Sequence, residues 1–293
     1  MIEAVPPGLQ NAIHTEYGEG RGGLAPRTAA VYTRGKCLLG TSWRSRVVVF
    51  VIVVVIVGIG GAALYVSMPY HGSTSSVRHV EADPALTVST EGGVHVLAPA
   101  DADSTVGFVF YPGARVAPDA YYDTFAPVVK RLNLTVFITE MPLDIALLDT
   151  DAAEGVRTRH PGIQTWFVGG HSLGGVAACQ YASAHDVQGL VLLASYCDGD
   201  VSDESFPALS VTGSADTVLD RENYRGAEPR LPPETTSHEI EGMNHTQFGS
   251  YRGQRGDSPA PLSYDDAHRR LADVLVPWLS NHSAAGEPAV GDQ

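Results

Sequence analysis

Residues 163–178 read IQTWFVGGHSLGGVAA, and this stretch decides the fold of the chain. The β-branched and aromatic run at 163–168 predicts a strand, and the small residues after Gly174 predict a helix. Between them, Gly170 to Gly174 follow the pattern G-x-S-x-G, a tight turn that lifts a serine into a strained, exposed position. Glycine fits both ends because a Cβ there would collide with the neighbouring helix or strand. The alternative is a glycine-rich turn without chemistry, so the interpretation depends on partner residues.

The chain around this turn predicts alternating strands and helices. Period-2 runs at 77–80, 86–89 and 94–97 predict an antiparallel opening to a sheet. Further strands are expected at 106–111, 135–139, 187–195, 208–212 and 235–240, and helices at 118–132, 143–158, 173–184 and 263–279. This order predicts an α/β fold with a mostly parallel central sheet that helices flank.

A serine becomes a nucleophile only when a base and an orienting acid reach it. Asp216 follows the strand predicted at 208–212, and His245 follows the strand predicted at 235–240. Singly, Asp216 reads as a turn or helix-cap residue and His245 as a surface histidine. Because the carboxyl ends of parallel strands meet at one edge of a sheet, the shared topology favours a triad of Ser172, His245 and Asp216. Asp220 is the reserve acid.

Acyl transfer also needs two backbone N–H groups that face the developing oxyanion. Leu173 follows the nucleophile and supplies one. Ala114 supplies the other from the turn after residues 106–111, where Gly113 permits a close approach of the backbone. The side chains expected to wall the substrate pocket are Tyr111, Met141 and Phe248, and His171 is expected to be a packing or pocket residue.

Residues 47–66 contain no charged side chain and no polar group except the Tyr65 hydroxyl. Twenty helical residues span about 30 Å, the thickness of a bilayer core, so the sequence predicts one membrane-spanning helix. Cleavage of a signal peptide near Ser67 is the alternative. The expected organisation is a disordered cytoplasmic tail at 1–46, a stalk and first strand at 67–85, the catalytic domain at 86–282 and a disordered end at 283–293.

Charge sets the expected orientation and partners. Residues 1–46 hold six Lys/Arg against three Glu, and the rest of the chain holds thirteen against thirty Asp/Glu, a balance of −17. The positive-inside tendency places the N-terminus in the cytoplasm and the catalytic domain outside the cell membrane. A domain so acidic is a poor partner for nucleic acid. Its acidic, lysine-poor surface is equally consistent with salt adaptation and with the composition bias of a GC-rich genome.

The cysteine and histidine spacings predict no metal site. Cys179 and Cys197 read as small buried residues, and free thiols are favoured over a bridge between them. No cofactor is expected, because a serine triad works without one.

Several motifs together carry a family resemblance: Phe110-Tyr111-Pro112-Gly113, Met141-Pro142-Leu143, Gly170 to Gly175, Gly213 to Asp216, and Asn244 to Gly249. The chain resembles the α/β-hydrolase superfamily over residues 94–279, near a membrane-anchored prokaryotic branch close to the dienelactone hydrolases. That group has a cysteine nucleophile where this chain has Ser172, which argues against dienelactone as the substrate.

The resemblance implies a serine hydrolase that acts on small-molecule esters. A peptidase, an acyltransferase and a non-catalytic surface-binding protein stay open as alternatives. The segment where this superfamily usually inserts a lid, residues 196–207, has only twelve residues and four carboxylates. The sequence therefore predicts an open site and a carboxylesterase that prefers short acyl chains.

Overall fold

The computed structural model describes residues 43–66 and 68–283, without the side chains of residues 59 and 62–66. The segments expected to be disordered lie outside these ranges, apart from residues 43–46 and Ser283, which are helical.

The first described element is α1 (Trp43–Val66), a 24-residue helix that contains the apolar run at 47–66. Its large apolar side chains from Val47 to Val57 are exposed. Among the described residues, no helix has the length and apolar character required to cross a membrane. The membrane span expected from the sequence is therefore not shown by the structure.

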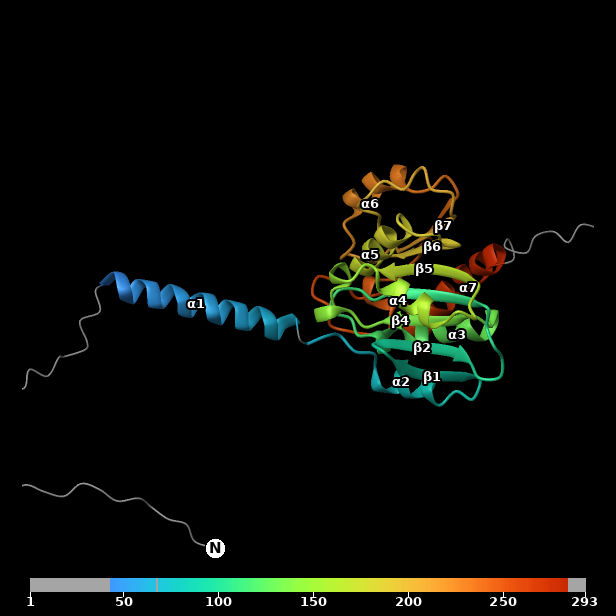
Figure 1. Cartoon of the computed structure of the whole chain (residues 1–293), viewed down its shortest axis with the longest axis horizontal. Coiled ribbons are helices and arrows are strands. Elements are labelled where there is room, and N and C mark those ends of the chain that lie inside the picture. The colour runs from blue at the N-terminus through green and yellow to red at the C-terminus, as the bar shows by residue number, and fades with distance from the viewer. Residues whose placement is uncertain (1–42, 67, 284–293) are drawn as a thin grey trace, which may run out of the picture. The chain divides into compact units, whose positions relative to one another are not determined.

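The described part of the chain forms one eight-stranded sheet in the order β1-β2-β4-β3-β5-β6-β7-β8 (Figure 1). Strands β1, β2 and β4 pair antiparallel, and all pairs from β4 to β8 are parallel. This confirms the predicted mostly parallel sheet with an antiparallel opening. The strands are β1 (Leu86–Glu91), β2 (Val94–Pro99), β3 (Val106–Tyr111), β4 (Thr135–Thr139), β5 (Thr165–His171), β6 (Gly189–Leu193), β7 (Ala208–Gly213) and β8 (Thr235–Ile240).

Helices cover both faces of the sheet. Buried residues of α2 (Thr74–Glu81), α3 (Tyr122–Leu132) and α7 (Tyr264–Ser283) join one core cluster with Phe108 and Phe110 of β3. The short helix α4 (Ala152–Arg159) and α5 (Leu173–Ala182) join a second cluster with Val109 and Tyr111, whose side chains leave the same strand on its other face. The central strands are buried on both faces for this reason, which explains their nearly all-apolar sequences.

Two elements expected from the sequence have a different structure. Residues 77–80 were expected to form a strand, but they belong to α2, where the Ser73 side chain caps the first turn by accepting the Ser76 N–H. Residues 143–158 were expected to form one helix. They form two 3₁₀ turns, η2 (Pro142–Asp144) and η3 (Ala146–Leu148), followed by α4. Leu143 and Asp144 have φ values of 53° and 54°, which an α-helix does not allow.

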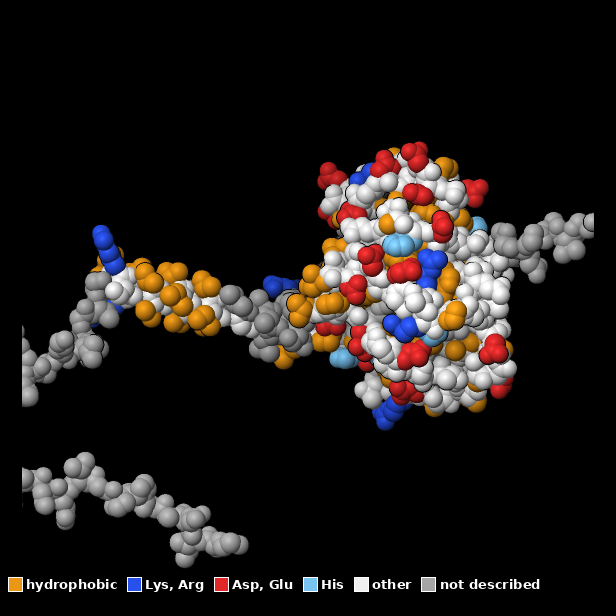
Figure 2. Space-filling view, viewed as in Figure 1, with side chains coloured by type: hydrophobic (Ala, Val, Ile, Leu, Met, Phe, Trp, Pro, Cys, Tyr) orange, Lys and Arg blue, Asp and Glu red, His pale blue; other side chains and the backbone are white. Residues whose placement is uncertain are grey.

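The remaining helical elements are short: η1 (Pro118–Tyr121), α6 (Arg221–Ala227), η4 (Glu228–Arg230) and η5 (His245–Phe248). Asp216, which could have been read as a helix cap, does not cap α6; that helix starts at Arg221 with Asp220 as its N-cap. Acidic side chains are spread over the visible face of the domain, with few basic ones among them (Figure 2).

Candidate active site

Ser172 lies between β5 and α5 with φ 53° and ψ −123°, a backbone conformation that residues other than glycine rarely adopt. A Cβ on Gly170 would approach the carbonyl carbon and oxygen of Gly174 to 2.3 Å. A Cβ on Gly174 would lie 2.1 Å from the backbone carbonyl oxygen of Tyr111. The close packing of strand, turn and helix thus requires both glycines. The strained serine turn predicted from the sequence is confirmed.

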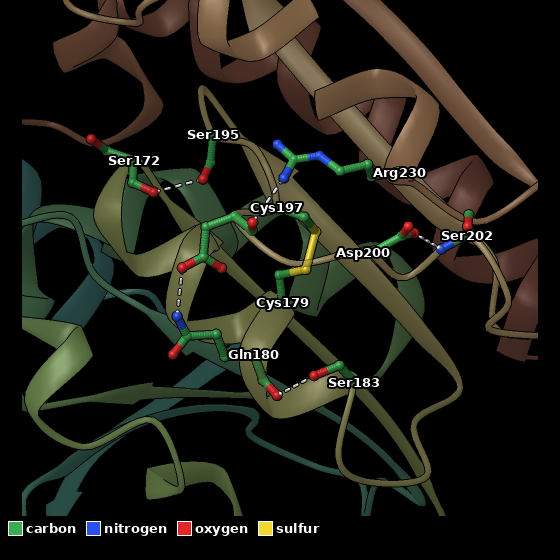
Figure 3. Close-up of a disulfide and its surroundings, with 10 residues drawn as sticks. Ser172, Cys179, Gln180, Ser183, Ser195, Cys197, Asp200, Ser202 and Arg230 are labelled. Atoms are coloured by element: carbon green, nitrogen blue, oxygen red, sulfur yellow. Dashed lines mark hydrogen bonds between the residues drawn. A yellow bond between two sulfur atoms is a disulfide. The ribbon is translucent and has the colours of Figure 1, made fainter. Parts of the chain in front are cut away.

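The turn is fastened to the end of β6. Ser172 N–H donates to the Leu193 carbonyl at 2.9 Å, and the Ser195 hydroxyl donates to the Ser172 carbonyl at 2.7 Å. Ser172 and Ser195 lie side by side in the close-up (Figure 3). These two hydrogen bonds, with the end of β6 and the loop after it, help to hold Ser172 in a conformation that costs about 1–3 kcal/mol.

His245 and Asp216 form a buried pair. Asp216 follows β7, His245 follows β8, and His245 Nδ1 lies 2.8 Å from Asp216 Oδ2, with both side chains at most 1% exposed. Burial acts to raise the pKa of Asp216, but the hydrogen bond with His245 and two backbone N–H groups outweigh it and lower the pKa. Those N–H groups belong to Val218 and Leu219. The carboxylate is therefore charged and oriented toward the imidazole.

The loop that carries His245 is held by a residue that the sequence did not single out. The Asp257 carboxylate accepts the backbone N–H groups of His245 at 3.2 Å and Thr246 at 2.9 Å. Asp257 lies in the segment between η5 and α7, where no period or motif marks it.

Ser172 and His245 line the same small cavity of about 190 Å³. The other side chains around it come from the start of α5 and from the loops after β6 and β7. His245 Nε2 is buried and has no hydrogen-bond partner among the described residues. The free nitrogen of the pair thus belongs to a residue that shares a cavity with the strained serine.

The predicted oxyanion groups lie in turns at the same edge of the sheet. Ala114 follows β3, and Leu173 is the first residue of α5. Within the described part of the chain, neither N–H donates to a protein acceptor. An unpaired N–H after β3 and another beside the serine are what an oxyanion hole requires.

A family model for the α/β hydrolase family matches residues 107–269, which is more than half of the chain. The chain belongs to the α/β hydrolase family. This hydrolase has the same fold as the Lip1 protein of Acinetobacter baumannii, with a TM-score of 0.52 and 12% identity over 72% of this chain and 96% of that chain. Est1E from Butyrivibrio proteoclasticus gives a TM-score of 0.50 and 12% identity over 68% of this chain and 99% of that chain. No curated protein sequence matches the hydrolase.

The side chains expected to wall the pocket do not line this cavity. None of Tyr111, Met141, His171 and Phe248 lines the cavity beside Ser172. Tyr111, His171 and Phe248 are completely buried, and Met141 is 8% exposed. The Tyr111 hydroxyl, for example, donates to the Thr150 carbonyl and accepts the Ala153 N–H. The sequence placed these residues near the right strand ends but could not show which way their side chains point.

Neither Asp220, the reserve acid, nor His238 takes part in the buried pair. Asp220 lines the cavity, but its carboxylate caps α6 by accepting the N–H groups of Glu222 and Asn223. His238 is exposed on the edge strand β8. The buried partner of Asp216 is His245.

Cys179 and Cys197 form a disulfide, so the expectation of free thiols is wrong. The bridge joins α5 to the loop after β6, which also carries Ser195 (Figure 3). Both cysteines are at most 1% exposed, and their Cα atoms lie 5.6 Å apart. The adjacency of β5 and β6 brings the two positions together, and the sequence offered a signal for the pair in the predicted export of the domain.

Proposed function

We propose that the chain is a serine hydrolase that cleaves carboxylic esters, with Ser172 as nucleophile, His245 as base and Asp216 as the orienting acid. The observation that carries the proposal is one cavity lined by a serine in a strained turn and by a histidine whose other nitrogen is bound to a buried carboxylate. A glycine-rich turn without chemistry has no need of a buried His–Asp pair at its cavity. A place near the dienelactone hydrolases stays a prediction from sequence motifs.

The reaction follows from these positions. Ser172 Oγ attacks the ester carbonyl while His245 Nε2 takes its proton, and Asp216 stabilises the resulting imidazolium through Nδ1. The N–H groups of Ala114 and Leu173 stabilise the tetrahedral oxyanion. His245 then protonates the leaving alcohol, and a water activated in the same way releases the acid from the acyl-enzyme.

The size of the cavity supports small substrates. About 190 Å³ is less than the 300 Å³ or more that drug-sized ligands usually occupy. Residues 196–207 contain no helix, and Asp198, Asp200, Asp203 and Glu204 make the segment acidic. We therefore propose an open carboxylesterase that prefers short acyl chains and shows no activation at a lipid interface.

A fluorophosphonate probe and a panel of esters of increasing acyl length test this function. The wild-type chain should be labelled, and Ser172→Ala should not. His245→Ala should lose several orders of magnitude in kcat, whereas His238→Ala, a matched control on the exposed edge strand, should keep full activity. An inactive His238→Ala with an active His245→Ala would refute the base assignment. Higher kcat/KM on long-chain than on butyrate-sized esters would indicate a lipase.

We also propose that residues 47–66 anchor the protein in the cell membrane, with the N-terminus in the cytoplasm and the catalytic domain outside. The apolar sequence and the excess of Lys/Arg before it support this location. The disulfide supports it too, because disulfides persist mainly in oxidising compartments. Protease added to intact cells should remove the catalytic domain, and a domain protected until cells are broken would refute the orientation.

A further inference from the structure

A buried hydrogen-bonded chain connects the turn after β3 with the residue that precedes the nucleophile. The Tyr121 hydroxyl accepts the N–H of Gly113 at 2.9 Å and lies 2.9 Å from Nδ1 of His171. Neither Tyr121 nor His171 is exposed to solvent. The His171 ring in turn contacts the His245 ring, with centroids 4.5 Å apart. Three loops at the catalytic edge thus meet at these two side chains.

The hydrogen bonds of the turn after β3 show what Tyr121 does there. Gly113 N–H donates to the Tyr121 hydroxyl, Arg115 N–H to the Asp144 carbonyl at 2.8 Å, and Val116 N–H to the Gly113 carbonyl at 3.0 Å. Only the Ala114 N–H, between them, has no acceptor among the described residues. The Tyr121 hydroxyl therefore fixes the peptide that immediately precedes the one with the free N–H.

One arrangement of the protons gives each hydrogen bond of this chain a donor and an acceptor. Because the Tyr121 hydroxyl accepts the Gly113 N–H, its own proton is available to donate to His171 Nδ1, which must then be unprotonated. Burial, followed by the neighbouring His245, holds the pKa of His171 well below its usual value, so the ring is neutral and Nδ1 can accept. Burial also raises the pKa of Tyr121, which keeps its proton.

The turn after β3 packs directly against both side chains. A Cβ on Gly113 would lie 2.9 Å from His171 Nδ1 and 3.3 Å from the Tyr121 hydroxyl oxygen, so the backbone of the turn approaches both side chains closely. Without the hydroxyl, the buried Gly113 N–H would lose its acceptor, which is unfavourable and promotes rotation of the turn.

We propose that Tyr121 and His171 are positioning residues that hold the Ala114 N–H toward the oxyanion formed at Ser172. The inference rests on the proposed function, since it assigns these side chains a role in the same acyl transfer. Neither touches the substrate: Tyr121 acts through the Gly113 amide, and His171 acts by orienting the Tyr121 hydroxyl.

The first test is Tyr121→Phe, which removes one oxygen and keeps the ring. Losing an oxyanion donor outright lowers kcat by about 10²–10³-fold, so a misplaced donor should lower it by about 10–100-fold. KM for a small ester should change by less than about twofold, because the ground-state carbonyl gains little from the hole. Phenylboronic acid, which forms a tetrahedral adduct with the serine, should bind more weakly by the same factor as kcat falls.

Tyr224→Phe is the matched control. The Tyr224 hydroxyl is also in a buried hydrogen bond, 3.0 Å from Ser210 Oγ, and it does not contact the turn after β3. A purely structural role for Tyr121 predicts that both variants lose thermal stability and keep kcat. Loss of kcat and of boronate affinity in Tyr121→Phe alone supports the proposal, and unchanged values in Tyr121→Phe overturn it.

A second pair of variants tests the role of His171 without relying on Tyr121→Phe to fold. His171→Asn keeps an acceptor near the position of Nδ1. His171→Leu introduces a side chain with a shape similar to that of asparagine but with no acceptor. The Asn variant should retain about tenfold more kcat than the Leu variant, since only it can orient the hydroxyl. Equal losses in the two would overturn the proposal for His171.

The wild-type chain separates this inference from the function on which it rests. A wild type that neither reacts with the fluorophosphonate nor hydrolyses any ester refutes the proposed function, and this inference with it. An active wild type with an equally active Tyr121→Phe refutes only the positioning role.

Discussion

Replacing both Cys179 and Cys197 by alanine should destabilise the catalytic domain substantially. The disulfide closes a loop with a sequence separation of 18 residues. In the chain-entropy model, opening a loop of this length costs about 3 kcal/mol in the free energy of unfolding. For a domain of this size, each kcal/mol shifts Tm by about 2–4 °C, so Tm should fall by about 6–12 °C. The loss of local stability should be greatest near Ser172, because the bridge fastens the helix that starts beside Ser172 to the loop that carries Ser195.

The assay is thermal unfolding of the full chain, purified from an oxidising compartment, with and without reductant. Reductant should lower the Tm of the wild type toward that of the double variant and leave the variant unchanged. Thiol titration of the unfolded wild type should find one reactive thiol, that of Cys37, among the three cysteines. Three reactive thiols, or equal Tm values for the wild type and the variant, would refute the reasoning.

Three further predictions concern the serine turn, pH and salt. Ser195→Ala removes the hydroxyl that donates to the Ser172 carbonyl, so the free energy of unfolding should fall by about 1 kcal/mol in urea titrations; an unchanged value would contradict the anchoring role. Burial lowers the pKa of both His171 and His268 in the folded chain, so the unfolded chain binds protons first as pH falls. Stability should therefore drop below about pH 6.5, by up to about 1.4 kcal/mol per pH unit for each histidine, and His268→Gln should make the drop shallower; an unchanged slope would speak against a neutral His268. Added salt should raise Tm if the acidic surface is salt-adapted, because screening relieves self-repulsion; a flat response up to molar salt leaves genome composition as the better account.

The sequence by itself determined the features of this protein that local patterns encode. The strained turn at Ser172 needs glycine on both sides for steric reasons, so Gly170 and Gly174 marked it. The parallel strands are buried on both faces, so their apolar runs marked them. Because loops at the carboxyl ends of parallel strands meet at one edge, strand order alone brought Asp216 and His245 into a single candidate site.

Tertiary structure decided the features that depend on which distant groups meet. Period-2 spacing at 77–80 did not reveal that Ser73 would cap a helix there, and the apolar residues at 143–148 did not reveal turns with positive φ. The disulfide, the Asp257 cap and the contact between Tyr121 and His171 each join residues from different elements of the fold. The composition of a segment reports whether its side chains are buried, but not what they are buried against. For that reason the walls of the cavity and the support of the Ala114 turn appear only in the folded chain.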